Sequence, residues 1–356
     1  MRFFLPRSGR GVTRAVVLLG LLSACRPAGA TPIGADRPVS AKSPIVIAHR
    51  GASGHRPEHT LASYALAVAM GADYIEPDLV ATKDGVLVAR HENEIGGTTD
   101  VATRFPARRV SKVVDGDTVT GWFVEDFTYA ELSTLRARER LAFRSHAYDG
   151  QFAIPTFDEV LSLADSAGRR RGRAVGVYPE LKHPTYFASI GLPLEQRLLA
   201  RLRAHGLDRQ DAPVFVQSFE VAPLRLLRPQ TRLRLILLLS GDGAPYDQAR
   251  AGDHRTGTAL TTPAGLREIA KYANGIGVNS RMLIGAAADA VPSSLVRDAH
   301  AAGLAVHVWT LRPEAQFLAA RYNGDPLAEV REFARLGVDG MFGDFPDLLV
   351  KGLGRP

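Results

Sequence analysis

The chain has 356 residues, 46% of them hydrophobic and 23% charged, and this composition indicates a globular protein rather than a disordered one. The formal net charge is +7, but Arg2, Arg7, Arg10 and Arg14 lie in an N-terminal segment that export would remove, so the charge gives no argument for a nucleic-acid partner. No apolar run reaches the roughly 18 residues that a membrane span requires. The basic run at residues 168–173 is interpreted as a solvated loop.

Residues 1–24 have the pattern of a signal peptide of the lipoprotein type, in which a positively charged start precedes a short apolar segment. Cys25 is the only cysteine, and the run Leu-Ser-Ala-Cys that it closes resembles the lipobox of bacterial lipoproteins. We therefore expect export to the periplasm or cell envelope, a lipid anchor on Cys25, and a flexible tether rich in Pro, Gly and Ala at residues 25–43. The alternative is ordinary cleavage after Ala30, which removes Cys25.

Short apolar runs alternate with helical patterns from residue 44 to residue 352. The strand patterns begin at about residues 45, 74, 175, 214, 233, 275, 304 and 338, and a helical segment follows each one. Residues 60–71, for example, place their apolar side chains on one helix face, with Thr60 positioned to cap the start. Strict alternation predicts a parallel sheet, and eight such units predict an α/β fold of the (β/α)8 TIM-barrel type over residues 44–352. An open doubly wound sheet is the alternative.

Residues 94 to about 153 interrupt this alternation after the second strand. They are rich in Asp, Thr, Arg and Gly, show little periodicity, and contain one helical pattern at residues 128–138. We interpret the segment as an insertion that lies over one end of the barrel. A loop of this length inside a compact domain is usually functional.

Carboxylates recur where the predicted strands end, which is the edge that carries the active site in such a barrel. Glu76 and Asp78 are two positions apart on the second strand, so both point to one face, and Glu180 lies near the end of the third. Three converging carboxylates repel one another unless a cation lies among them, and oxygen ligands suit Ca²⁺ or Mg²⁺. The alternative is that Glu76 and Asp78 only pair with lysine or arginine side chains.

Cations and histidines lie at the same strand ends. Arg50 follows the first strand and Lys182 the third, and beside a metal ion the two would clamp a phosphoryl group. His49 and His91 are then candidates for the general acid and the general base, because histidine titrates near neutral pH. Taken in isolation, each histidine is better interpreted as a hydrogen-bonded turn or surface residue.

The segment at residues 49–92 closely resembles the signature of the glycerophosphodiester phosphodiesterases, in particular the secreted bacterial type. It reads HRGASGHRPEHTLASYALAVAMGADYIEPDLVATKDGVLVARHE, and the resemblance continues through TTDVATRFP, GVYPELKHP, VQSF, EIAKYANGIG, MLI and GVDGMFGDFPD, covering nearly all of residues 45–347. The resemblance implies a (β/α)8 barrel that hydrolyses glycerophosphodiesters to glycerol 3-phosphate and an alcohol. It also implies a divalent ion, commonly Ca²⁺ or Mg²⁺.

Carried over onto matching positions, the resemblance implies an acid–base pair, a set of metal ligands and two phosphate-binding cations. These are, in that order, His49 and His91; Glu76, Asp78 and Glu180; and Arg50 and Lys182. Glu58, in the run PEHT, matches an acidic residue of the site loop. The chain departs from the family at Glu92, where aspartate is usual, and at Trp309, which replaces the tyrosine of a usual H-P-Y-T run. The second departure bears on the alcohol that the substrate-binding site accepts.

Two other functions are compatible with the same residues. The first is a related barrel phosphodiesterase that acts on intact phospholipid, of the phospholipase D-like or phosphoinositide type, but the polar composition of the insertion favours a soluble small-molecule substrate. The second is a non-catalytic glycerophosphodiester-binding lipoprotein of the envelope, and the presence of both His49 and His91 argues against it. Beyond the anchor at Cys25 we expect no membrane partner.

Overall fold

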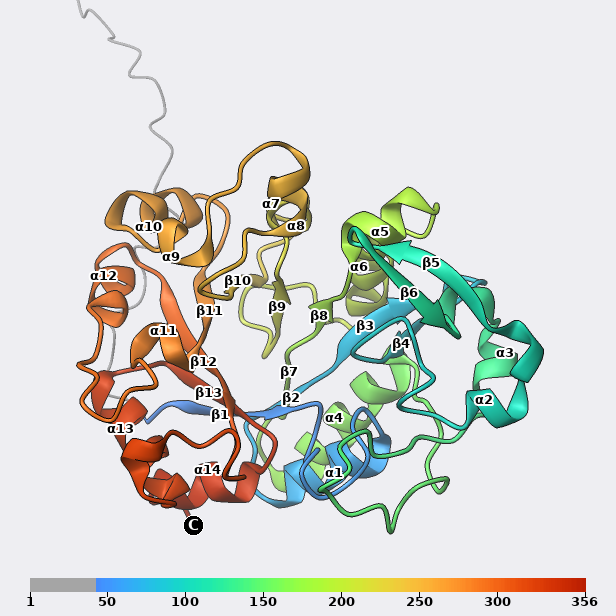
Figure 1. The fold of residues 1–356 in the computed structure, drawn as a ribbon, viewed down its shortest axis with the longest axis horizontal. Helices are drawn as coiled ribbons and strands as arrows, with labels where there is room; N and C mark the ends of the chain where they lie inside the picture. Colours follow the sequence, from blue (N-terminus) through green and yellow to red (C-terminus); the bar gives the residue numbers. More distant parts are fainter. Residues whose placement is uncertain (1–42) are drawn as a thin grey trace, which may run out of the picture. The chain divides into compact units, whose positions relative to one another are not determined.

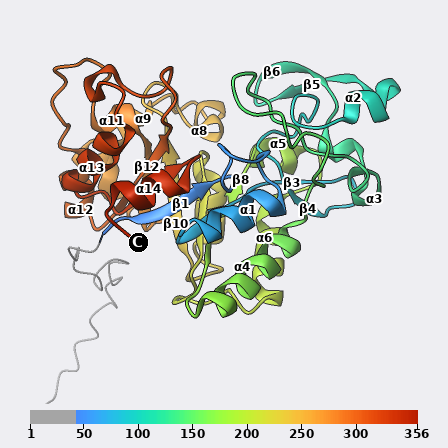
Figure 2. The same cartoon turned by 90° about the horizontal axis from the view of Figure 1, so that it is seen from below.

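The computed structural model describes residues 43–356, and the signal peptide, Cys25 and nearly all of the expected tether lie outside the described residues. A parallel sheet forms the centre of the described chain, with the helices arranged outside it (Figures 1 and 2). Its strands, in chain order, are β1 (Ile45–His49), β2 (Tyr74–Glu76), β3 (Asp78–Ala81), β7 (Gly176–Val177), β8 (Glu180–Leu181), β9 (Phe215–Ser218), β10 (Arg234–Leu239), β11 (Gly275–Asn279), β12 (Ala305–Leu311) and β13 (Gly340–Gly343).

The sheet closes on itself through two long strands that are each interrupted by a proline. Pro77 separates β2 from β3 and Pro179 separates β7 from β8, since proline has no N–H to donate to the ladder. Both proline carbonyls still accept a neighbour's N–H at 2.9 Å, Pro77 from Glu180 and Pro179 from Gln217. Because β13 pairs with β1, β1 with β2, β2 with β7 and β3 with β8, the ladder returns to its start. The predicted (β/α)8 barrel is confirmed, and the open sheet is wrong.

Helices follow the strands and begin where the sequence places capping residues. The Thr60 side chain accepts the Ser63 N–H at the start of α1 (Leu61–Ala69), and Thr156 forms a capping box with Glu159 at the start of α4 (Phe157–Arg171). The other outer helices are α6 (Leu194–Ala204), α7 (Val221–Leu227), α10 (Pro263–Ile269), α12 (Leu295–Ala301), α13 (Pro326–Leu336) and α14 (Pro346–Gly352). Shorter helices in the loops are α5 (Pro184–Ser189), α8 (Tyr246–Arg250), α9 (Gly257–Leu260), α11 (Ser280–Leu283) and η3 (Ala320–Tyr322).

The basic run at residues 168–173 is not a loop throughout, which corrects the sequence-based interpretation. α4 continues to Arg171 and ends at Gly172, whose φ of 67° places it in the left-handed conformation that glycine adopts without strain. Arg169, Arg170 and Arg171 lie in the last helical turn, where positive charge is favoured by the helix dipole, and Arg173 lies beyond the helix.

Large side chains fill the barrel interior. The cluster consists of Ile47, Tyr178, Phe215, Ile236 and Phe342. His307 is buried beside it, and its Nδ1 lies 2.6 Å from the Tyr178 hydroxyl. Burial lowers the pKa of His307 to about 4, so this imidazole is neutral at pH 7. His307 therefore belongs to the packed interior rather than to a catalytic site.

The insertion contains more regular structure than the sequence analysis expected. After β4 (Leu87–Ala89), which pairs antiparallel with β3, it forms α2 (Val101–Arg104), η1 (Pro106–Arg108), the hairpin of β5 (Val110–Val114) and β6 (Asp117–Gly121), η2 (Val124–Asp126) and α3 (Tyr129–Leu132). The helix predicted at residues 128–138 therefore has only four residues. In Figure 1 the insertion lies beside β3, β4 and α5.

No helix within residues 43–356 combines the length and the apolar composition needed to cross a bilayer.

Substitution of Gly176 by alanine is expected to lower the free energy of unfolding by about 1–3 kcal/mol, because it overpacks the barrel. A Cβ on Gly176 would overlap the ring of Tyr74, which itself packs against Phe215 at a centroid distance of 5.2 Å. Gly97→Ala is the matched control, since nothing lies within 4 Å of its Cβ position. Denaturant unfolding of both variants checks this, and equal stability of the two would contradict the packing described here.

Candidate active site

Three buried carboxylates meet at the carboxyl ends of two neighbouring strands. Glu76 ends β2, Asp78 begins β3, and Glu180 begins β8 directly opposite Asp78 in the parallel register. Each residue offers a carboxylate oxygen, and these three oxygens all lie within 4.8 Å of one another. The alternation of side chains along the strand explains why Glu76 and Asp78 share a face. The structure thus brings together all three residues that the sequence predicted as metal ligands.

The charges of this acidic cluster are only partly balanced by the protein. Burial and the negative charges of Asp78 and Glu180 raise the pKa of Glu76 well above its ordinary value. Burial raises the pKa of Glu180 to about 8, with Asp78 adding to the effect and Lys182 opposing it. Asp78 behaves oppositely: burial is outweighed by the hydrogen bond from His59 and by nearby cations, which hold its pKa well below the usual range. A set of buried oxygen donors with unbalanced negative charge fits a hard divalent cation.

Arg50 lies at the centre of the site and binds the cluster in two ways. Its backbone N–H donates to Glu76 at 2.9 Å, and its guanidinium Nε lies 3.4 Å from a carboxylate oxygen of Asp78. A φ of 60° places Arg50 in the left-handed conformation, which turns the chain sharply after β1. Its Nη1 donates to Glu58 at 3.0 Å, so Glu58 orients Arg50 and is not among the residues that line the cavity.

Lys182 supplies a second fixed cation. Its Nζ lies 3.0 Å from Glu180 and 3.4 Å from Nε2 of His91. Burial opposes the charged form, but Glu180 and Asp78 raise the pKa of Lys182 above its ordinary value, so the ammonium stays charged. The two predicted phosphate-binding cations therefore flank the acidic cluster.

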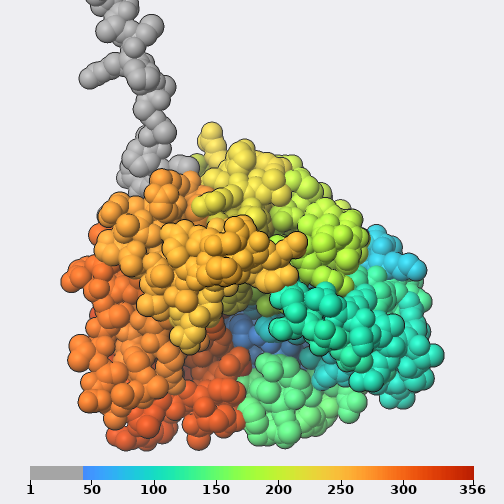
Figure 3. All heavy atoms as spheres, turned by 45° about the horizontal axis from the view of Figure 1, so that its top comes forward, coloured from blue at the N-terminus to red at the C-terminus, as the bar shows by residue number. Residues whose placement is uncertain are grey.

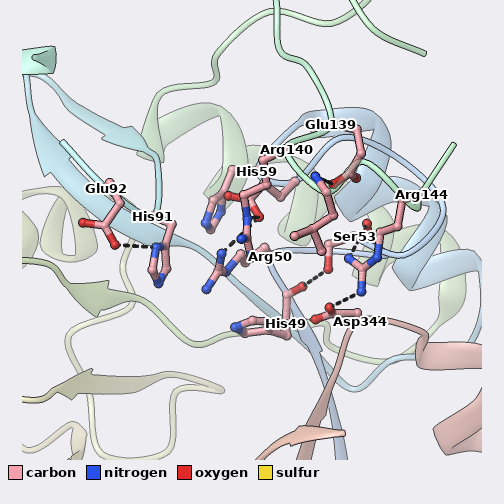
Figure 4. Close-up of polar contacts among 12 residues, drawn as sticks. His49, Arg50, Ser53, His59, His91, Glu92, Glu139, Arg140, Arg144 and Asp344 are labelled. Atoms are coloured by element: carbon pink, nitrogen blue, oxygen red, sulfur yellow. Dashed lines mark hydrogen bonds and ion pairs between the residues drawn. The ribbon is translucent and has the colours of Figure 1, made fainter. Parts of the chain in front are cut away.

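His49 is oriented by a carboxylate from the last strand of the barrel. Its Nδ1 lies 2.6 Å from Oδ1 of Asp344, which follows β13, and the contact is buried (Figure 4). Because a carboxylate only accepts, Nδ1 carries the proton and Nε2 is left with its lone pair. Burial and the cation of Arg50 lower the pKa of His49 to about 4, although Asp344 opposes the shift. His49 is thus neutral at pH 7 with a defined tautomer.

His91 has the same arrangement on a different strand. Its Nδ1 lies 2.7 Å from Oε1 of Glu92 (Figure 4). Its Nε2 faces the ammonium of Lys182, which can only donate. Burial, Arg50 and Lys182 lower the pKa of His91 to about 3. Both histidines therefore present an unprotonated Nε2.

A cavity of about 380 Å³ opens among these groups. Its lining includes the predicted residues His49, Arg50, Glu76, His91, Glu180 and Trp309, together with Gln217, Phe219, Asn279, Arg281, Arg312 and Phe317. The Trp309 ring lies 5.5 Å from that of Phe219, and its indole N–H has no partner among residues 43–356. Figure 3 shows the surface hollowed between the insertion and the loops of the C-terminal half.

Several residues of the site were given no role by the sequence analysis. His59 is fully buried between Asp78 and the Tyr64 hydroxyl, at 2.8 Å from each. The Gln217 amide donates to Glu76 at 3.0 Å. Gln217 and Asp344 both stand at predicted strand ends, which was a usable signal, and His59 directly follows Glu58 in a run that the sequence analysis had already quoted.

Known proteins resemble this chain over most of its length. Residues 49–348 match the model of the glycerophosphoryl diester phosphodiesterase family. A glycerophosphodiester phosphodiesterase of Arabidopsis thaliana is 35% identical over 87% of this chain and 86% of its own length, and one of Treponema pallidum is 32% identical over 88% and 92%. The solved structure of an Oleispira antarctica phosphodiesterase in complex with the product sn-glycerol-3-phosphate covers 88% of this chain and 97% of its own, with a TM-score of 0.54 and 22% identity.

The family match spans the barrel together with the acidic cluster, both histidines and both cations at its mouth. The chain therefore belongs to the glycerophosphoryl diester phosphodiesterase family.

Proposed function

We propose that this phosphodiesterase hydrolyses soluble glycerophosphodiesters to sn-glycerol 3-phosphate and an alcohol, with His49 and His91 as the acid–base pair and a divalent cation held by Glu76, Asp78 and Glu180. The observation that carries the proposal is that one cavity is lined by Glu76, Glu180, Arg50 and both oriented imidazoles, with Asp78 and Lys182 in direct contact with these groups just outside its lining. The Oleispira antarctica relative, whose structure holds sn-glycerol-3-phosphate, supports this product.

Arg50 and Lys182 bind the phosphodiester in this proposal. Both are buried and charged, so they lose little hydration when an anion replaces water beside them. A bound divalent ion, Ca²⁺ in the first instance and Mg²⁺ as the alternative, would supply further neutralisation of the phosphoryl oxygens. Donors fixed before the substrate arrives stabilise the charge that develops in the transition state without reorganising.

The two histidines move the protons. In their free state both are neutral with an unprotonated Nε2, so either can accept the proton of the nucleophile. The arriving phosphodiester brings negative charge, which favours protonation of one of the two imidazoles. That imidazolium then gives its proton to the departing alkoxide.

Trp309 and Phe219 pack against each other within the apolar part of the cavity lining, and we assign them to the alcohol of the substrate. The unpartnered indole N–H of Trp309 is a donor available to an oxygen of that group. The alternative substrate is an intact phospholipid, for which Val113 and Phe143 are large exposed apolar side chains on the insertion.

The purified enzyme is expected to release glycerol 3-phosphate from glycerophosphocholine and related soluble diesters, and to lose this activity when a chelator removes divalent ions. Added Ca²⁺ or Mg²⁺ should restore it, because the cluster would otherwise hold uncompensated charge. A coupled glycerol 3-phosphate assay, with thermal melting as a second measurement of ion binding, checks both points. Full activity in chelator would refute the metal requirement, and turnover of phospholipid alone would refute the substrate class.

His49→Ala and His91→Ala are each expected to lower kcat by at least about 100-fold, the contribution typical of general acid–base catalysis. His205→Ala is the matched control, because His205 is a partly exposed histidine of the α6 end that bonds to Asp158 outside the cavity. Steady-state kinetics and far-UV circular dichroism measure activity and folding. If either variant folds and keeps near wild-type kcat, the role assigned to that histidine is wrong.

We propose further that the protein is exported and lipid-anchored at Cys25. Expression in a bacterial host with labelled palmitate is expected to label the wild type and leave Cys25→Ser unlabelled, with the wild type in the membrane fraction. A mature protein that begins after Ala30 would show that ordinary signal cleavage occurs instead.

A further inference from the structure

We infer that the insertion holds both catalytic histidines from two sides, with Arg144 acting on His49 through Asp344 and Asp115 acting on His91 through His183 and Glu92. Arg144 and Asp115 are positioning residues, since neither lines the 380 Å³ cavity between the two histidines; Asp115 lines a neighbouring cavity of about 230 Å³ that Glu180 and Lys182 also line. The inference rests on the catalytic roles proposed for His49 and His91.

The side chain of Arg144 lies beside Asp344 and is only 6% exposed. Its Nη2 donates to Oδ2 of Asp344 at 2.6 Å, and its Nε donates to Glu314 at 2.8 Å. Arg312 donates to the same Oδ2 at 2.6 Å. With Oδ2 fixed by two guanidinium groups, Asp344 has only Oδ1 to offer to Nδ1 of His49, and its carboxylate cannot rotate (Figure 4). The orientation of His49 therefore depends on an arginine that the insertion supplies.

Asp115 reaches the other histidine through a chain of hydrogen bonds. His183 lies between two carboxylates, with Nδ1 at 2.6 Å from Asp115 and Nε2 at 2.9 Å from Oε2 of Glu92. Since carboxylates only accept, both ring nitrogens of His183 must carry protons, and the ring is an imidazolium. The other oxygen of Glu92 faces Nδ1 of His91 at 2.7 Å. His183 thus fixes Glu92 as Arg144 fixes Asp344.

Asp115 is placed by the turn of the β5–β6 hairpin. Asp115 and Gly116 both have positive φ, at 49° and 93°, which is the pattern of the tight two-residue turns that suit the twist of paired strands. The turn places the carboxylate beside His183, which is the residue immediately before α5. A hairpin with no residue in the lining of the 380 Å³ cavity therefore contacts the histidine system through Asp115.

A third contact follows the same pattern. Arg140 donates from Nε to Oε2 of Glu58 at 3.0 Å, and the same oxygen accepts from Arg50 at 3.0 Å. Each contact joins the insertion to a group that orients a site residue, rather than to the site residue itself. Surface ion pairs contribute little to stability, but the Arg144–Asp344 pair has side chains only 6% and 2% exposed, so it is a fixed part of the framework.

The test uses the full chain and variants that keep the fold. Arg144→Gln removes the donor to Asp344, and Asp115→Gly removes the carboxylate while keeping a residue that tolerates positive φ. Each is expected to lower kcat by about 10- to 100-fold with KM changed less than about 3-fold, because a misplaced catalytic group slows the chemical step more than binding. Arg144→Lys and Asp115→Asn should recover part of the loss. Arg138→Gln, on a more exposed arginine of the same segment, is the matched control.

A double-mutant cycle separates this inference from a general structural role. Arg144→Gln combined with Asp344→Asn should be no slower than Asp344→Asn alone, because both act on His49 through one carboxylate. Additive losses would overturn the route through Asp344, and so would kcat values of Arg144→Gln and Asp115→Gly within 2-fold of wild type. A loss with only one of these two variants would overturn the two-sided arrangement. Active His49→Ala and His91→Ala variants would instead refute the proposed function itself.

Discussion

Three carboxylates buried at one rim of the barrel are the constraint around which the mouth is built. Glu76, Asp78 and Glu180 converge because strands β2–β3 and β7–β8 each pass a proline without leaving the ladder, so the backbone keeps them in register. Like charges this close in a poorly solvated site are costly. Donors from four residues face the cluster: the Arg50 backbone and guanidinium, Lys182, His59 and Gln217. The pKa of Glu180 is still raised to about 8, so these donors do not fully neutralise the cluster. A further positive charge beside it would therefore be stabilised.

Burial also explains why further charged residues surround the two histidines. Burial makes His49 and His91 neutral, and a neutral imidazole is useful for proton transfer only when its tautomer is fixed. Asp344 and Glu92 fix the tautomers; the Asp344 side chain is buried and needs a cation, whereas the Glu92 side chain is 49% exposed. Arg144 and Arg312 donate hydrogen bonds to Asp344, and the His183 imidazolium donates one to Glu92. Charge therefore alternates in sign outward from the cavity, and on the Asp344 side the loss of a cation would leave a buried carboxylate less well paired.

The fold could be predicted from the sequence because its signals are local. The first predicted strand begins at Ile45 as expected, and the last begins at Gly340 instead of about 338, since apolar runs and capping threonines report on a few neighbouring residues. The acidic cluster was also readable, because Glu76 and Asp78 share a face by strand alternation. The β5–β6 hairpin was missed although Asp115-Gly116 lies between β-branched runs, which is a recognised turn signal.

The role of Arg144 could not be predicted, because its partner lies 200 residues away in the sequence and no local periodicity reports such a contact. That separation also has a consequence for how the site forms. His49 ends the first strand and Asp344 follows the last, so they meet only when β13 pairs with β1 and the barrel closes. Arg144, from a segment between them, binds Asp344 in this closed arrangement. Contacts between such distant parts of a chain form late, because the loop-closure entropy must be overcome first. The oriented form of His49 is therefore a property of the closed barrel, and no fragment lacking either the first or the last strand contains it.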